Sequence, residues 1–323
     1  MVGKVRQQMI NIPKQLQSSI IQLLKNNAAG DLSKAAADLS YTYRKAREQD
    51  FITNRQERLA YMAARMPATY AAASSVLQHL PQVKSILDIG SGTGAVAWAT
   101  HEIWPHASYT GLERDPGLIE IAKSLASFDA NWLQGDMTAS KLANAELVTI
   151  SYALNELTDT ETNRVIEKLW QATDKYLCII EPGTVSAYTR LMIVRDYLLS
   201  KGAHILAPCP HHAVCPMASK DWCHFSVRLQ RPDFQRSTKQ ASLPYEDEKY
   251  AYLIVSKQPV DRPLGRLVKR PIKKSGHIYL DACHHGRLER LTITKRQRDQ
   301  YAAAKKSNWG DDWNHFDRIS QDS

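Results

Sequence analysis

Short apolar runs alternate with longer helix-compatible segments through the middle of the chain. The run at 85–89 is apolar except for Asp88, and it leads into the glycine-rich segment 90–94 and then into the apolar segment 95–99. This pattern predicts a buried parallel strand, a tight loop and a helix whose first N–H groups are free. Similar strand-like runs occur at 108–113, 132–137, 147–151 and 176–181. The alternation therefore predicts a mostly parallel α/β sheet.

The first part of the chain, residues 1–81, is predicted to be a helical leader. Helices are predicted from about Pro13, over 34–48, over 53–65, and over 68–80 with Pro67 at the start. We expect this leader to pack at the edge of the sheet. Four basic residues and no acid in the first thirty positions also fit a transit peptide, but the apolar spacing favours a surface helix.

The remaining chain divides into three expected segments. Residues 82–200 form the Rossmann-like core, 201–248 a cysteine-rich insertion, and 249–323 the last core strands with a basic β extension. Within the extension, 277–280 and 288–294 predict a hairpin with Cys283 in its turn.

Composition limits the class of protein. The chain has 323 residues and is 43% hydrophobic, which suffices for a sizeable core. Because no apolar run reaches 18 residues, we expect no membrane partner. Five cysteines at uneven spacing do not fit a secreted disulfide scaffold. We expect a monomer.

The glycine loop allows three interpretations, which are two different ligands and a turn that binds no ligand. Gly90, Gly92 and Ala95 fit the dinucleotide fingerprint of nicotinamide enzymes. With Asp88 and Gly94 added, the loop resembles the D-x-G-x-G-x-G loop of class I S-adenosylmethionine (SAM) methyltransferases, which we favour. The expected cofactor-binding residues follow the ends of the strands: Asp88, Gly90, Gly92, Gly94, Glu113, Asp136 and Ser151. An acid in the position of Glu113 accepts hydrogen bonds from ribose hydroxyls.

No catalytic residue is evident. The segment 151–157 lacks both the Pro–Pro–aromatic motif of enzymes that methylate exocyclic amines and a Pro–Cys nucleophile. Cys178 lies between apolar residues of a predicted strand, so we expect a buried thiol. Methyl transfer can depend largely on positioning, so activity stays open.

Four other cysteines suggest a metal centre. Cys209, Cys215 and Cys223 lie in a Pro- and His-rich segment, and Cys283 follows much later. Zinc sites usually show paired C-x2–4-C knuckles, whereas this wide spacing suits an iron–sulfur cluster better. Nearby histidines keep a Cys3His zinc site open: His211, His212, His224, His284 and His285.

Several motifs in one order resemble a known family. They are Arg65–Tyr70, the glycine loop, Glu181–Gly183, Cys209–Pro210–His211 with Cys215–Pro216, Asp221–Phe225, Glu246–Tyr250 and Trp309–Asp311. Together they resemble the methyltransferase-like small-ribosomal-subunit assembly proteins, which have mitochondrial and bacterial members. The resemblance implies a class I SAM-methyltransferase fold, association with the small ribosomal subunit or its rRNA, and a [4Fe–4S] cluster on Cys209, Cys215, Cys223 and Cys283.

Positive charge is concentrated near the end of the chain. Residues 257–306 contain 14 Lys or Arg and 4 Asp or Glu, a formal charge of +10, while the whole chain carries +9. This excess predicts a surface for a phosphate backbone. Trp222, Phe225 and Phe234 are interleaved with arginines, which suggests stacking on unpaired RNA bases.

These features predict an rRNA-binding factor in small-subunit assembly or translation, with SAM and a [4Fe–4S] cluster as cofactors. One alternative is an active SAM-dependent rRNA methyltransferase. Another is a zinc-containing RNA-binding protein with an inactive SAM pocket. We expect a cytoplasmic protein if the chain is bacterial and a protein of the mitochondrial matrix if it is eukaryotic.

Overall fold

The computed structural model describes residues 9–27, 32–45, 52–217 and 221–316, and it forms two compact units. The first, which we call the sheet unit, consists of Met9–Glu181 and Val227–Glu248. The second, which we call the cysteine unit, includes the described residues of Pro182–Ser226 and Lys249–Ser323. The unit boundaries therefore divide the expected segments 82–200 and 201–248, while 249–323 lies within the cysteine unit.

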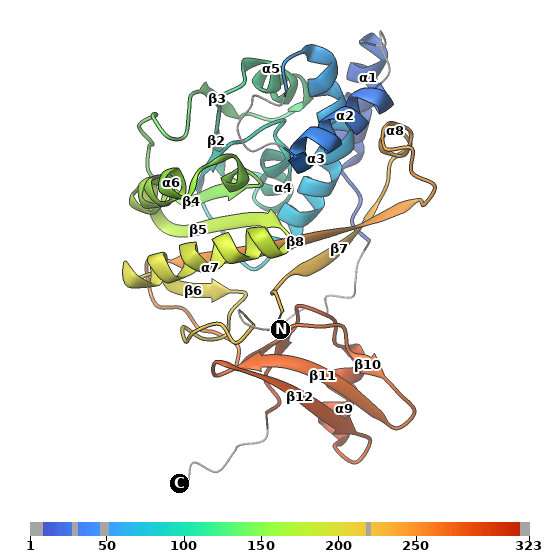
Figure 1. Ribbon diagram of the computed structural model, residues 1–323, viewed down its shortest axis with the longest axis vertical. Helices are drawn as coiled ribbons and strands as arrows, with labels where there is room; N and C mark the ends of the chain where they lie inside the picture. Colours follow the sequence, from blue (N-terminus) through green and yellow to red (C-terminus); the bar gives the residue numbers. More distant parts are fainter. Residues whose placement is uncertain (1–8, 28–31, 46–51, 218–220, 317–323) are drawn as a thin grey trace. The chain divides into compact units, whose positions relative to one another are not determined.

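Five parallel strands form the centre of the sheet unit (Figure 1). They are β1 (Ser85–Ile89), β2 (Ser108–Glu113), β3 (Asn131–Gln134), β4 (Ala145–Ser151) and β5 (Thr173–Pro182), in the order β3-β2-β1-β4-β5. Strand β1 pairs with β2 on one edge and with β4 on the other. The chain thus moves outward from β1 to β3 and returns to β4 on the other side of β1. This reversal is the switch point at which open α/β sheets bind ligands.

Helices connect and cover these strands. They are α1 (Lys14–Asn26), α2 (Leu32–Lys45), α3 (Arg55–Leu77), α4 (Ala95–Ile103), α5 (Pro116–Leu125), the short 3-10 helix η1 (Leu154–Glu156), α6 (Asp159–Ala172) and α8 (Asp233–Thr238). Helix α3 packs against α4 and α5, and α6 packs against β4. Helix α3 thus packs on other helices, and the expected place of the leader at the sheet edge stays a prediction.

Helix α3 also corrects the prediction of two helices separated at Pro67. The helix runs through Pro67 without ending. A proline inside a helix costs about 3 kcal/mol, since one hydrogen bond is lost and the ring crowds the previous turn. Most of α3 is buried, including Ala71, Ala72 and Ala73 at 0% exposure. We infer that burial of this small-residue face outweighs the local cost.

The cysteine unit contains α7 (Val185–Ser200), β6 (His204–Ala207) and a second sheet (Figure 1). Strand β6 pairs antiparallel with the part of β8 (Tyr245–Ser256) that belongs to this unit, while β7 (Phe225–Gln230) and β8 both continue into the sheet unit. The second sheet comprises β9 (Gly265–Leu267), β10 (Ile272–Lys273), β11 (His277–His284), β12 (Arg287–Thr294) and β13 (Asp312–Trp313), with helix α9 (Arg298–Lys306) packed on β11 and β12.

Strand β11 divides its side chains between two clusters. Ile278, Leu280 and Ala282 enter a core that also contains residues of β12, α9 and β13. Cys283 is out of phase with them and joins a different cluster, as the period-2 geometry of a strand requires. Cys283 therefore lies in the strand, which corrects its predicted place in the turn. The turn itself is His285–Gly286, both with positive φ, as a two-residue hairpin of type I′ needs.

The α/β class is confirmed, with a mostly parallel sheet of the Rossmann-like, class I methyltransferase type. Strands β1 and β2 have their predicted bounds, whereas β3 ends at Gln134 rather than at 137. Its end precedes a turn in which the Asp136 carboxylate accepts hydrogen bonds from Thr138. Among the described helices, none is long and apolar enough to cross a membrane.

Candidate cofactor site and cysteine cluster

The three loop glycines have positive φ for three different local reasons. A Cβ at Gly90 would lie 2.9 Å from the Cβ of Ala153, and one at Gly94 would lie 2.9 Å from the ring of Trp132. A Cβ at Gly92 would meet nothing within 4 Å. Gly90 and Gly94 thus allow close packing, whereas Gly92 borders open space at the switch point. An open, side-chain-free backbone is what a closely approaching ligand requires.

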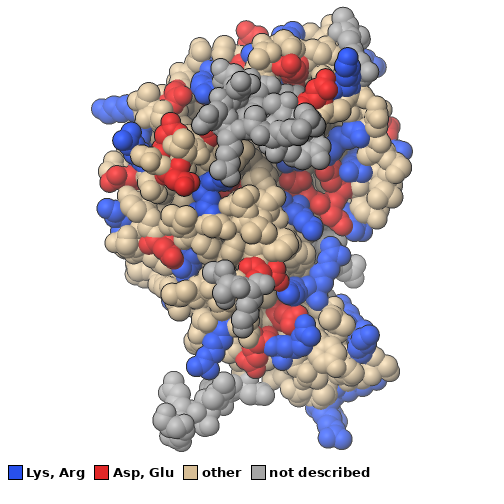
Figure 2. Space-filling model, in the orientation of Figure 1, with Lys and Arg blue, Asp and Glu red and all other residues tan. Residues whose placement is uncertain are grey.

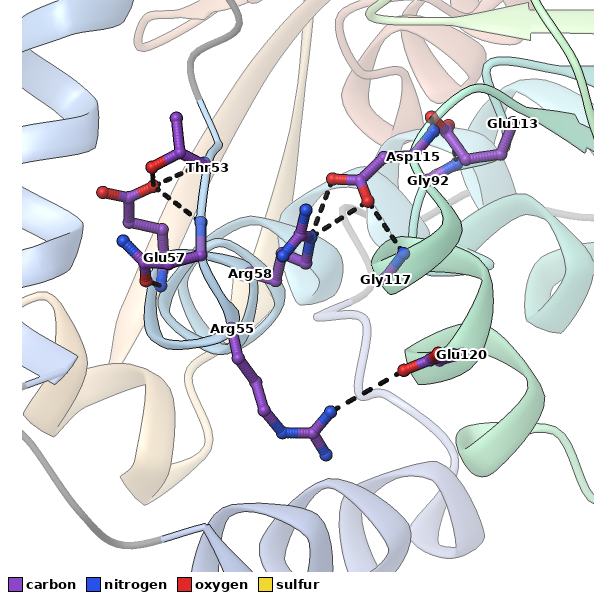
Figure 3. Close-up of polar contacts among 10 residues, drawn as sticks. Thr53, Arg55, Glu57, Arg58, Gly92, Glu113, Asp115, Gly117 and Glu120 are labelled. Atoms are coloured by element: carbon purple, nitrogen blue, oxygen red, sulfur yellow. Dashed lines mark hydrogen bonds and ion pairs between the residues drawn. The ribbon is translucent and has the colours of Figure 1, made fainter.

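Glu113 at the end of β2 holds the loop in place (Figure 3). Its carboxylate accepts one hydrogen bond from Gly92 N–H at 2.8 Å and another from Asp115 N–H at 2.9 Å. Asp115 caps α5 by accepting from Gly117 N–H, and Arg58 of α3 donates to the same carboxylate at 2.8 Å. The carboxylates of Glu113 and Asp115 therefore connect the glycine loop, β2 and α5. The sequence singled out Glu113 for this site but not Arg58, because Arg58 is distant from it in the chain.

Asp88 lies in the interior of the sheet rather than at its edge. Its side chain is 1% exposed, and its two oxygens accept from Tyr109 Oη at 2.7 Å and Thr149 Oγ1 at 2.6 Å. Burial raises the pKa of Asp88 to about 7, although both hydrogen bonds act in the opposite direction. Asp88 thus braces β1 between β2 and β4, and any contribution to ligand binding acts through the loop that follows.

The other expected residues lie on the same edge of the sheet unit. Asp136 is partly buried, and the hydrogen bond from Thr138 lowers its pKa. Ser151 ends β4, and its hydroxyl is buried with no hydrogen-bond partner among the described residues. Ser91 Oγ and Asn155 Oδ1, in the segments after β1 and β4, are in the same state. Buried polar atoms without partners at a switch point fit a site that a polar ligand completes.

Sequence reasoning missed a polar cluster beside this edge. Tyr152 follows β4 with φ of 58°, a left-handed conformation that is rare for a bulky residue. Its hydroxyl donates to Glu248 at 3.0 Å, and Arg65 of α3 also donates to Glu248 at 3.0 Å. The Arg65 guanidinium lies 5.6 Å from the centre of the Tyr152 ring. These contacts hold the Tyr152 backbone in its strained conformation, and they join segments too distant in sequence for a local pattern.

In the cysteine unit, three of the four expected metal ligands share one apolar cluster. Cys283 is buried, and Cys215 and Cys223 pack against the same apolar cluster. Cys215 Sγ lies 3.1 Å from Tyr188 Oη, and Cys283 Sγ lies 3.2 Å from His211 Nε2. Cys178 is buried in β5 of the sheet unit, as expected for a core thiol.

The pKa values of the clustered cysteines depend on one another's charges. Burial raises the pKa of Cys223, and the charges of Cys209, Cys215 and Cys283 raise it further. Burial likewise raises the pKa of Cys283 to about 12, with further contributions from Cys209 and Cys215. Such mutual repulsion between thiolates is relieved by a bound cation.

The thiols do not form a ready-made site for one ion. Among the described residues, no three His, Cys, Asp or Glu side chains are grouped closely enough to hold a metal ion. A single zinc ion with 2.3 Å bonds needs tetrahedral sulfurs about 3.8 Å apart.

The basic segment lies on the second sheet of the cysteine unit. Lys273, Lys274 and Lys295 are exposed, and backbone hydrogen bonds to His277 and Gly276 bring Lys274 and Lys295 to the same turn. Figure 2 shows Lys and Arg side chains spread over this sheet with acidic ones between them. The surface can contact phosphates at several points.

The surroundings of the arginine-flanked aromatic residues differ from one to the next. Phe225 is buried, whereas Trp222 and Phe234 are half-buried, and Trp222 donates from Nε1 to Gly183 O at 3.0 Å. In the sheet unit, Arg228 is bound in a bidentate pair with Asp247, and Arg231 pairs with Glu246. Phe225 is therefore not available for stacking, and stacking of RNA bases on the other aromatic residues stays a prediction.

A family comparison covers both sites. The family described as "Mitochondrial small ribosomal subunit Rsm22" matches residues 55–314, which include the glycine loop and all four clustered cysteines. The chain belongs to this family. The resemblance seen in the sequence motifs is thereby confirmed at the level of the family.

Two curated relatives of this Rsm22-family chain are similar over most of its length. Human "Ribosome assembly protein METTL17, mitochondrial" is 26% identical over 285 residues, which cover 78% of this chain and 61% of that protein. "Rsm22-cox11 tandem protein 2, mitochondrial" of Schizosaccharomyces pombe is 26% identical over 321 residues, covering 78% and 42%. The chain thus spans less than two thirds of either relative. Both relatives are named as mitochondrial proteins.

Solved methyltransferases resemble the chain only distantly. Human N-acetylserotonin methyltransferase with SAM gives a TM-score of 0.44 at 17% identity, covering 76% of this chain and 71% of that one. Magnesium protoporphyrin IX methyltransferase from Synechocystis with SAM gives 0.39 at 12%, covering 74% and 97%. The fold description therefore depends on the strand order and glycine loop of this chain itself.

The buried Asp88 predicts an unusual pH dependence of stability. Its pKa is about 7 in the folded state against 3.8 as the ordinary value, so the folded protein binds the proton more tightly. The free energy of unfolding should then fall as pH rises from about 4 to about 7, by on the order of 4 kcal/mol at most. Denaturant titrations should give the free energies of unfolding of wild type and Asp88→Asn. The excess stability of the wild type over the variant should shrink or reverse from pH 5 to pH 8.

Asp136→Asn serves as the control of opposite sign. Because its pKa is lowered, Asp136 contributes stability that is present at neutral pH and lost on acidification. A wild-type minus Asp88→Asn difference that is the same at pH 5 and pH 8 would show that Asp88 ionises normally.

Proposed function

We propose that this chain is an assembly or translation factor of the small ribosomal subunit that binds its rRNA, carries a [4Fe–4S] cluster and binds SAM. The observation that carries the proposal is the family match, which extends over both the glycine loop and the cysteine cluster. The human relative is named as a ribosome assembly protein. The relatives' names support the mitochondrial matrix as the compartment.

The glycine loop fits SAM by its chemistry. Gly92 leaves the backbone open, Glu113 supplies carboxylate oxygens for ribose hydroxyls, and the Asp136 turn follows β3, where this fold places the adenine. The buried hydroxyl of Ser151 has no hydrogen-bond partner among the described residues, and a polar ligand would supply one. Bound SAM would supply an activated methyl group. The residues named here bind and orient, and none is an evident proton acceptor.

Substitution of Gly92 tests the cofactor. Gly92→Leu should weaken SAM binding at least about tenfold by calorimetry, because the side chain fills the open cradle. Gly202→Leu is a matched control, since Gly202 also has positive φ and open space around it. Both changes strain the backbone, so only a loss confined to Gly92→Leu reports on the ligand. Wild-type protein that binds no SAM would remove the cofactor from the proposal.

The four cysteines are the donor set that the family resemblance implies for a [4Fe–4S] group, with zinc as the alternative. The pKa values of these thiols depend on one another's charges. Three of them come from the segment 209–223, and the fourth comes from β11. A group bound by all four would connect these segments and offset the entropy of ordering the long connection between them.

Removal of one thiolate tests the cluster. Cys283→Ser should lose iron and sulfide after anaerobic purification, and the same variant should melt earlier. Cys178→Ser should keep both, because Cys178 is in the core of the sheet unit. One zinc and no iron in the wild type would replace the cluster with zinc. Full iron in Cys283→Ser would exclude Cys283 as a ligand.

Charge removal tests the RNA surface. Changing Lys273, Lys274 and Lys295 to Gln should weaken binding to small-subunit rRNA. It should also reduce the slope of log affinity against log salt by about 0.7 for each phosphate that the variant no longer neutralises. Lys84, Lys123 and Lys141 are exposed on the sheet unit, and their triple change to Gln is the control. Equal slopes for the two triple variants would show that the second sheet does not contact phosphate.

Crosslinking in cells followed by sequencing of the attached RNA tests the proposal as a whole. Recovery of small-subunit rRNA is the expected result, and its absence would overturn the proposed partner. Incorporation of methyl groups from labelled SAM into that rRNA would favour the active methyltransferase alternative. Binding of rRNA with neither SAM nor iron would favour the zinc-containing RNA-binding alternative.

A further inference from the structure

Two arginines in the cysteine unit are buried almost completely. Arg195 of α7 is 1% exposed and Arg266 of β9 is 3% exposed. A buried guanidinium cannot lose its proton, so its charge must be balanced by a nearby anion or the fold loses several kcal/mol. The anionic groups near these two side chains therefore indicate what kind of ligand this interior can bind.

Arg266 has a carboxylate partner and also holds the cysteine segment. Its Nη1 donates to Asp312 Oδ1 at 2.7 Å and to Gly310 O at 2.8 Å, and its Nε donates to Pro208 O at 2.9 Å. Pro208 immediately precedes Cys209. In the β9–β11 ladder Arg266 stands opposite Cys283. Arg266 thus fixes the backbone beside one cysteine and lies next to another.

Arg195 is balanced less completely. Its Nη2 donates to Ala213 O at 2.7 Å and His211 O at 3.4 Å, which fixes the segment between Cys209 and Cys215. Its carboxylate partner is the adjacent Asp196, whose side chain is 69% exposed and so largely screened by water. The buried Nε has no hydrogen-bond partner among the described residues. The Nε–H donor and most of the positive charge of Arg195 therefore require a further, anionic partner.

The candidates for that role are the cysteine sulfurs. Arg195 donates to the backbone of the segment between Cys209 and Cys215. Arg266 donates to Pro208 O, next to Cys209, and lies opposite Cys283 in the ladder. Both guanidiniums are therefore held beside cysteines.

We propose that Arg195 and Arg266 are the countercharges of an anionic metal–thiolate group bound by the four cysteines, with Arg195 Nε–H reserved for a sulfur of that group. Four thiolates around a core of charge +2 leave a net charge of −2, for zinc and for an oxidised cluster alike. The two guanidiniums offset part of this charge, because Arg266 is also paired with Asp312. The inference rests on the proposed metal centre, and it assigns positioning and charge to residues that bind no metal themselves.

Retention of the metal is the first test. Wild type, Arg195→Met and Arg195→Lys are purified without oxygen and exposed to a chelator, and loss of the bound metal is followed with time. Groups that hydrogen-bond to metal ligands change metal affinity by about 10- to 100-fold, so Arg195→Met should lose metal at least about tenfold faster. Arg195→Lys keeps the charge without the Nε–H fork and should be intermediate.

Two further variants separate this effect from general damage. Arg290→Met removes an exposed arginine of the same unit that pairs with Asp281, so it matches the loss of charge and of an ion pair at a surface position. Asp196→Asn leaves Arg195 without its surface partner while retaining the buried positive charge. Both should keep the metal as the wild type does, with unchanged circular dichroism.

The reduction potential gives a readout that a merely structural role would not move. For a wild type that contains iron, titration with dithionite should show a lower potential in Arg195→Met than in Arg290→Met, because the reduced cluster carries one more negative charge. A tenfold change in the one-electron equilibrium is 59 mV, the shift expected for Arg195→Met. Asp196→Asn should shift the potential upward or not at all.

The outcomes separate the two proposals. A wild type that holds no metal overturns both the metal centre and the role of the arginines. A wild type that holds iron or zinc, together with an Arg195→Met variant that retains it at the wild-type rate, overturns only the role of Arg195. Faster loss in Arg290→Met as well as in Arg195→Met would show a nonspecific effect of charge and also count against it.

Discussion

The pairing of β1 with both β2 and β4 is the constraint on which the rest of the sheet unit depends. It makes β1 the central strand, so its residues are buried on both faces and form an almost continuous apolar run. It also places the glycine loop where the strand order reverses, with the segment after β4 close enough that Ala153 approaches Gly90. Asp88 is the exception in this strand, and its carboxylate is tolerated because Tyr109 and Thr149 on the two flanking strands both donate to it.

Features set by local pattern could be predicted from the sequence. Strands β1 and β2 have their predicted bounds, because apolar runs that end at glycine or an acid leave little freedom in register. That Cys209, Cys215, Cys223 and Cys283 bind one metal centre stays a prediction, since it was inferred from their spacing and from the family resemblance. What the sequence did not indicate is how β11 reaches the cluster. Extending the strand through Cys283 needed the pairing of Cys283 with Leu288, which is a property of the hairpin.

The predictions that were wrong, and the residues that the sequence missed, share one physical cause, which is contact between segments that are distant in the chain. Pro67 ends a helix by local rules, but burial of α3 on α4 and α5 is a sum over many residues and exceeds that cost. Glu248 has no visible role in an acidic stretch until Arg65 and Tyr152 are placed beside it. Likewise, Arg195 and Arg266 cannot be distinguished in sequence from solvent-exposed arginines, and only their burial marks them as different.

This distinction changes how the charge of the cysteine unit should be interpreted. The formal +10 of residues 257–306 includes Arg266, which is buried, and Lys269 and Arg290, which pair with Asp221 and Asp281. These groups release few counterions when a phosphate backbone binds, because their charges are already compensated within the protein. The charge available to RNA is therefore smaller than the composition suggests, and it is concentrated on exposed lysines such as Lys273, Lys274 and Lys295. The same stretch of sequence thus combines exposed lysines with an arginine that is buried opposite Cys283.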